Sequence, residues 1–143
     1  MHRREHSREG KTVGETKKIL IAEDDPASRE LLLEILDLMG YEVIAACDGA
    51  EALQKIGETQ PDLALLDIQM PVLDGFAVLH RIRQDALFAN LPVIALTAYA
   101  MKEDREKSLR AGFNAHISKP VDVAALRSQI ERHLNIKVSS DPF

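Results

Sequence analysis

Polar side chains stand directly after four short apolar runs of this 143-residue chain. The runs KILIA, LALL, PVIAL and AHIS are followed, in that order, by Glu23, Asp24 and Asp25, then by Asp67, Thr97 and Lys119. Two carboxylates about 4 Å apart repel by about 4 kcal/mol at an effective dielectric constant of 20, so clustered acids require a cation. Carboxylates without a cysteine or histidine cluster favour a hard ion, Mg²⁺ or Mn²⁺, over zinc. The residue types therefore predict a metal site for phosphate chemistry, in which Lys119 supplies a positive charge and Thr97 a hydroxyl donor.

Asp67 is the candidate nucleophile of this site. The sequence contains no GxxxxGK[ST] phosphate-binding loop, and no Ser/His/Asp arrangement stands out. A carboxylate can itself attack phosphorus and form an acyl phosphate. Asp67 ends the most apolar of the runs, so it is the best-placed carboxylate for that reaction.

The elements that must position these groups alternate along the chain. Short apolar runs predict strands at 18–22, 41–46, 63–66, 92–96 and 115–118, and apolar residues at helical spacing predict helices at 26–40, 48–56, 74–85, 101–112 and 121–134. In the first helix Asp25 suits the cap, Pro26 the first position and Gly40 the end. Five strands alternating with five helices predict an α/β fold with a doubly wound parallel sheet, covered by helices on both faces. Ligands of such sheets bind beyond the carboxyl ends of the strands, which is where the polar groups converge.

The composition agrees with one soluble domain. The chain is 45% hydrophobic and has a net charge of −5, which argues against direct binding of nucleic acid. Cys47 is a single cysteine, and no run is long enough to span a membrane, so we expect a cytoplasmic protein. We expect disordered tails at 1–16 and 136–143 around a domain at 17–135, because the tails have few large apolar side chains.

The stretches ILIAEDDPASRELL, PDLALLDIQMPVLDGF, PVIALTAYAM and AHISKP resemble the receiver domain of bacterial response regulators. Thr97 lies 30 residues beyond Asp67 and Lys119 lies 52 beyond it, spacings that the family shares. Among these, the sequences TAYAM and DIQMPVLDG are most similar to single-domain regulators of the cell-cycle type and to receivers of hybrid kinases. The resemblance implies a flavodoxin-like (βα)5 fold with the strand order 2-1-3-4-5.

The resemblance also implies a role for each site residue. Asp67 would be phosphorylated by a histidine kinase or a histidine phosphotransfer protein. Asp24, Asp67 and the backbone carbonyl of Gln69 would bind Mg²⁺ directly, and Glu23 mainly through water. Lys119 would contact the phosphoryl group.

Further residues would carry the switch and set the lifetime of the phosphate. Thr97 would hydrogen-bond the phosphoryl group in the active state, and the peptide before Pro120 is expected to be cis. Gln69 and Tyr99 would tune dephosphorylation. His116 stands where the family often has Tyr or Phe, which leaves the aromatic part of the switch open.

The expected output is a change in protein binding. The helix at 101–112 has few apolar anchors, chiefly Met101 and Leu109, so we expect it to move easily and to form the readout face with 115–118 and 121–134. No output domain follows in the sequence, so we expect a stand-alone regulator that binds a downstream protein, as a monomer or a weak phosphorylation-dependent dimer.

Other interpretations remain open beside this one. The alternative is a receiver that relays phosphate within a hybrid histidine kinase. A haloacid-dehalogenase-like phosphatase would need an acid where Gln69 stands, and an adaptor that works without phosphorylation would lack Asp67 or Lys119. We therefore expect a phosphoacceptor and not a turnover enzyme.

Overall fold

Five parallel strands form the centre of the structure, a computed structural model that describes residues 16–98 and 102–135. The strands are β1 (Lys18–Ala22), β2 (Glu42–Ala46), β3 (Leu63–Asp67), β4 (Val93–Thr97) and β5 (Ala115–Ser118). Their order in the sheet is β2-β1-β3-β4-β5, so β1 and β3 lie side by side at the centre. The predicted doubly wound fold and its strand order are confirmed.

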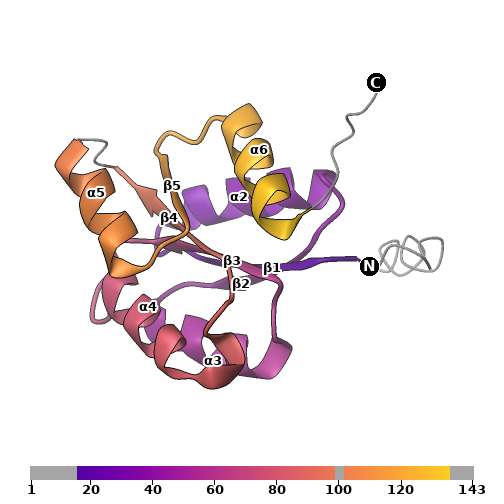
Figure 1. The fold of residues 1–143 in the computed structure, drawn as a ribbon. Helices are drawn as coiled ribbons and strands as arrows, with labels where there is room; N and C mark the ends of the chain where they lie inside the picture. The colour runs from indigo at the N-terminus through magenta and orange to yellow at the C-terminus, as the bar shows by residue number, and fades with distance from the viewer. Residues whose placement is uncertain (1–15, 99–101, 136–143) are drawn as a thin grey trace.

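Helices cover both faces of the sheet (Figure 1). They are α2 (Pro26–Leu38), α3 (Gly49–Thr59), α4 (Gly75–Gln84), α5 (Lys102–Ala111) and α6 (Val123–Leu134), with a short 3-10 helix, η1 (Ala86–Phe88), that the sequence patterns did not predict. Figure 1 shows α2 and α6 on one face and α3 and α4 on the other. In the described ranges 16–98 and 102–135, no helix has both the length and the apolar character needed to cross a bilayer.

The two faces of the sheet carry two hydrophobic clusters. Alternate residues of β1 contribute to each: Leu20 and Ala22 pack with α3 and α4, whereas Ile19 and Ile21 pack with α2 and α6. β3 and β4 are buried along their whole length. Strands covered on both faces must be apolar throughout, and this is why Asp67 is exceptional at the end of β3.

Aspartates cap four of the helices at the edge of the sheet where the strands end. The Asp25, Asp48, Asp74 and Asp122 side chains accept hydrogen bonds from backbone N–H groups in the first turns of α2, α3, α4 and α6. Each cap satisfies an N–H that has no partner within its helix and so fixes where the helix begins. The predicted capping role of Asp25 agrees with this geometry.

The expected anchoring of α5 is wrong in one respect. Leu109 is 52% exposed and does not fix the helix to the sheet; the residue that α5 buries is Ser108. The Ser108 hydroxyl lies 3.1 Å from the Asp104 carbonyl one turn earlier, so even this buried group is bonded within its own helix. Met101, the other expected anchor, lies outside the described residues. Helical spacing alone did not reveal that a small polar residue faces the sheet.

Candidate functional site

Three carboxylates converge where β1 and β3 end. Glu23, Asp24 and Asp67 each offer an oxygen, and these oxygens all lie within 4.8 Å of one another. The pairing of Ala22 with Leu66 brings the two strand ends together and so places the acids on the same edge. Glu23 is fully buried and Asp67 is 4% exposed, whereas Asp24 faces solvent.

Lys119 closes the cluster from the position directly after β5, two strands along the sheet from β3. Its Nζ lies 2.8 Å from Asp67 Oδ2 and 2.7 Å from Glu23 Oε1. Burial lowers the pKa of Lys119, but the hydrogen bonds and charges of Asp67 and Glu23 outweigh burial and raise the pKa above its ordinary value. The lysine is therefore charged, and its ammonium group contacts two of the three clustered carboxyl groups.

Glu23 carries the strongest sign that the cluster is built for a cation. Burial raises the pKa of its carboxyl group, and the contact with Lys119 opposes that rise. Oε2 accepts a hydrogen bond from the Asp25 N–H at 3.1 Å. Oε1 lies 2.7 Å from Lys119 Nζ, so a positive charge already lies against this buried oxygen. Converging oxygen donors of this kind fit a hard divalent ion such as Mg²⁺.

The loop after β3 fixes the orientation of Asp67. Asp67 Oδ1 accepts a hydrogen bond from the Gln69 N–H at 2.9 Å, while Oδ2 faces Lys119. Gly75 lets α4 approach closely, because a Cβ there would lie 2.7 Å from the Asp67 carbonyl oxygen. In the same loop Val72 has a positive φ of 68°. It lies at the centre of a tight turn in which the Leu73 N–H donates a hydrogen bond to the Pro71 carbonyl oxygen.

The remaining sequence-derived residues lie along β4 and β5. Thr97 ends β4, is 4% exposed, and its carbonyl accepts a hydrogen bond from Lys119 N–H at 2.8 Å. The Lys119–Pro120 peptide bond is cis, as the sequence resemblance implies. Tyr99 lies outside the described residues.

His116 pairs with Ala95 on the edge strand β5. Its Nε2 is buried and has no hydrogen-bond partner among the described residues. Burial, and then the positive charge of Arg105, lower the pKa of the ring. An imidazole in this environment is neutral near pH 7.

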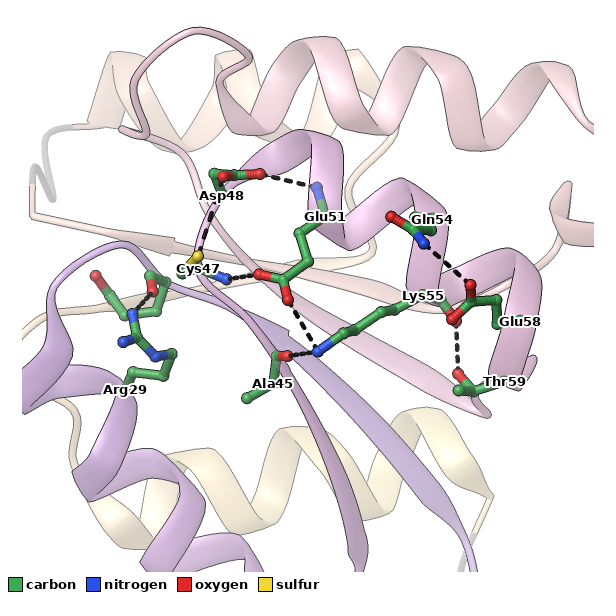
Figure 2. A network of polar contacts seen from close by, with 10 residues as sticks. Arg29, Ala45, Cys47, Asp48, Glu51, Gln54, Lys55, Glu58 and Thr59 are labelled. Carbon is green, nitrogen blue, oxygen red and sulfur yellow. Dashed lines mark hydrogen bonds and ion pairs between the residues drawn. The ribbon is translucent and has the colours of Figure 1, made fainter.

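Arg29 contacts the acidic loop and was overlooked in the sequence. Its Nη1 lies 2.8 Å from the Glu23 carbonyl oxygen and 3.4 Å from that of Asp24. Figure 2 shows Arg29 near a second network, in which Glu51 accepts from the Cys47 N–H at 2.7 Å and lies 3.0 Å from Lys55. A basic residue four positions after the capping Asp25 was the available signal, because helical side chains lean toward the N-terminus.

An apolar pocket lies beside the charged cluster, between α2 and the loop that joins β5 to α6. It is lined by Glu23, Ser28, Leu31, Leu32, Ile35, Lys119, Pro120 and Val121. Leu31, at 56% exposure, extends the apolar lining onto the surface of α2. The acidic centre is therefore flanked by a hydrophobic surface on one side.

Comparisons with known proteins agree on one family. The response regulator receiver domain family matches residues 19–131. The polar-differentiation response regulator DivK of Brucella ovis is 39% identical over 119 residues, which are 83% of this chain and 97% of the relative.

Two solved structures have the same fold. A putative response regulator from Chloroflexus aurantiacus superposes with a TM-score of 0.81 at 33% identity, over 85% of this chain and 99% of the other. The receiver domain of the Pseudomonas aeruginosa sensor histidine kinase PA1611, with a magnesium ion coordinated in its active-site cleft, has a TM-score of 0.78 and 34% identity, over 84% and 98%. With its fold and the family match over most of its length, this chain belongs to the response regulator receiver domains of two-component signalling systems.

Proposed function

We propose that Asp67 accepts a phosphoryl group from a phosphohistidine of a histidine kinase or histidine phosphotransfer protein, in a Mg²⁺-dependent reaction. The observation that carries this proposal is the convergence of Asp67, Glu23 and Asp24 at one edge of the sheet, with Lys119 within ion-pair distance of Asp67 and Glu23. We further propose that the protein is a cytoplasmic phosphoacceptor and not a turnover enzyme.

The transfer exchanges one bond to phosphorus for another. A carboxylate oxygen of Asp67 forms the new O–P bond as the N–P bond of the donor imidazole breaks, and the released nitrogen takes up a proton. The Gln69 N–H holds Oδ1, so the attacking carboxylate cannot rotate freely. Lys119 already contacts Asp67 at 2.8 Å and can transfer that contact to a phosphoryl oxygen.

Magnesium would lie among the three acids. Asp24, Asp67 and the Gln69 carbonyl would hold it directly, and Glu23 mainly through water. When bound, the ion neutralises the developing charge on the phosphoryl oxygens. The convergence of three carboxyl groups within 4.8 Å and the burial of Glu23 support this assignment.

Phosphorylation would then change the face formed by α5, β5 and α6. The phosphoryl group adds nearly two negative charges, toward which Thr97 would move. Converting a 1:99 mixture of two states into 99:1 takes about 5.5 kcal/mol, which a few charge-assisted hydrogen bonds can supply. The weak anchoring of α5 supports this output, since its buried residue is the small Ser108. His116 lies on the same face, and Gln69 and Tyr99 are the residues that we propose tune the lifetime of the phosphate.

The donor would dock on the apolar surface beside the site. A phosphohistidine must come within bonding distance of Asp67, and the pocket between α2 and the β5–α6 loop shares Glu23 and Lys119 with the charged cluster. An apolar surface of a helical donor would cover the exposed Leu31 and the pocket-lining Ile35. Output through α5, β5 and α6 would then use a separate face, by binding a downstream protein or a second copy of the chain.

A second candidate is a receiver that relays phosphate within a hybrid histidine kinase. The similarity to the PA1611 receiver, which is part of a sensor histidine kinase, favours this alternative. The reading frame of the full gene separates the two, because only the hybrid kinase would encode kinase domains in the same chain.

The proposal is tested by incubation with Mg²⁺ and acetyl phosphate, read by intact mass. Wild type should gain one phosphoryl group, and the gain should be absent with EDTA and in Asp67→Asn. A wild-type protein that stays unlabelled under conditions that label another receiver domain contradicts the proposal. Leu31→Asp tests docking: it should slow transfer from a cognate phosphohistidine protein but leave labelling by acetyl phosphate unchanged.

A further inference from the structure

We propose that Arg29 is a positioning residue of the metal site. In this view its guanidinium holds the main-chain carbonyls of Glu23 and Asp24, and this keeps the side chains of both residues directed toward Asp67. The inference rests on the proposed Mg²⁺ site, and it adds a residue that acts on the ligands without touching the ion.

The first observation is the geometry of the contacts. Arg29 Nη1 donates to the Glu23 carbonyl oxygen at 2.8 Å and makes a longer contact of 3.4 Å with the Asp24 carbonyl oxygen. Figure 2 shows the guanidinium near Cys47, at the end of β2. The same nitrogen therefore spans two successive peptide groups of the loop that carries two of the three acids.

The second observation is that these carbonyls lie where the chain leaves the sheet. β1 ends at Ala22, and the Glu23 N–H makes a further sheet-like bond to the Ala46 carbonyl at 3.1 Å. Glu23 is fully buried, and a buried carbonyl without a partner is costly. Arg29 supplies the partner that a neighbouring strand would otherwise supply.

The third observation is that the position of Arg29 does not favour α2 itself. Arg29 is the fourth residue of α2, a helix with no acidic residue in its first turn. A positive charge near a helix N-terminus opposes the helix dipole. The contacts with the loop give a physical reason for an arginine in a place that the helix alone disfavours.

Electrostatics and positioning predict effects of opposite sign, which makes the inference testable. If Arg29 acted only as a nearby positive charge, its removal would relieve repulsion of Mg²⁺ and strengthen binding. If Arg29 holds the loop, its removal lets Glu23 and Asp24 sample other orientations and weakens binding. Residues that orient metal ligands typically contribute about tenfold to metal affinity, or more.

The experiment is calorimetric titration of the folded protein with MgCl2 alone. We expect Arg29→Met to bind Mg²⁺ about tenfold more weakly than wild type, and Arg29→Lys to fall between them because it keeps the charge on a shorter side chain of different shape. The control is Arg81→Met, which removes the same charge from an exposed site on α4 and should leave the affinity unchanged. At saturating Mg²⁺, labelling of Arg29→Met by acetyl phosphate should reach the wild-type rate, so that only the Mg²⁺ concentration for half-maximal rate shifts.

Equal or tighter Mg²⁺ binding by Arg29→Met would overturn the positioning role. If that variant does not fold, Arg29→Lys decides, since it keeps the charge: wild-type affinity overturns the inference and weaker affinity supports it. Absence of Mg²⁺ binding by wild type itself would instead overturn the proposed metal site, and the Arg29 inference with it. The two failures are thus distinguishable.

Discussion

Removing Lys119 should destabilise the protein and make its stability depend strongly on Mg²⁺. Lys119→Met removes the positive charge 2.8 Å from Asp67 and 2.7 Å from Glu23. At an effective dielectric constant of 20, each contact is worth about 6 kcal/mol of gross attraction. Most of that is offset by desolvation, and removal of one partner from a buried pair costs about 3–5 kcal/mol.

The lower end of that range applies here. The Lys119 side chain is 25% exposed, and water can partly solvate the acids that it leaves behind. We therefore expect a loss of about 3 kcal/mol at neutral pH in EDTA, which for a chain of this size lowers Tm by about 10 °C. A divalent ion supplies the missing positive charge, and saturation to 100 times Kd stabilises a folded protein by about 2.7 kcal/mol.

The assay is urea unfolding of wild type and Lys119→Met, in EDTA and in saturating MgCl2. The variant should gain more stability from Mg²⁺ than wild type does, because Lys119 no longer competes for the same carboxylate oxygens. Lys102→Met, at an exposed position in α5, is the matched control and should change little in either condition. A Lys119→Met protein as stable as wild type in EDTA, or one that gains no more from Mg²⁺, would refute the electrostatic account of the site.

Three further outcomes follow from individual residues. Val72→Gly should raise the free energy of unfolding, measured in urea, by about 1 kcal/mol. The reason is that Val72 is fully exposed and gains nothing from burial, while its β-branched side chain is strained at φ 68°. Unchanged stability would show that the turn carries no strain. Glu51→Gln should cost about 1 kcal/mol at pH 7 after allowance for screening, and the cost should disappear as pH falls from about 5 toward 2. The reason is that the Cys47 N–H and Lys55 lower the pKa of Glu51 to about 2; a pH-independent difference contradicts this. His116→Phe should flatten the loss of stability between about pH 7 and pH 5, because burial and Arg105 lower the pKa of His116 and charging it disfavours the folded state; an unchanged pH profile contradicts this.

The sheet was predictable because its signals are local. Runs such as LALL and VIAL are apolar at every position, which only a doubly covered strand requires, and the observed β3 and β4 contain these runs. The carboxyl ends of parallel strands share one edge, so the meeting of Glu23, Asp67 and Lys119 there was predictable once a parallel sheet was expected. Helix boundaries were less accurate: α3 continues to Thr59, three residues beyond its predicted end, and stops at Gln60 in the left-handed conformation.

The features that the sequence did not indicate depend on the direction of individual side chains and on backbone conformation in loops. The contact of Arg29 with two carbonyls left only a weak signal in the sequence, a basic residue four positions after Asp25, because the acceptors are backbone groups that any residue provides. Leu109 fits the helical period of 101–112, but the helix is rotated so that Ser108 faces inward. The turn at Val72 was not predicted either, since a β-branched residue seldom adopts a positive φ.

Mass spectrometry can show which carboxylate of the chain carries the phosphoryl group. Wild-type protein is labelled with acetyl phosphate and Mg²⁺, reduced with borohydride to convert an acyl phosphate into an alcohol, digested, and sequenced by mass spectrometry. We expect homoserine at Asp67 and no conversion at Glu23 or Asp24. Conversion at another carboxylate, or labelled protein with Asp67 unmodified, would contradict the proposed role of Asp67.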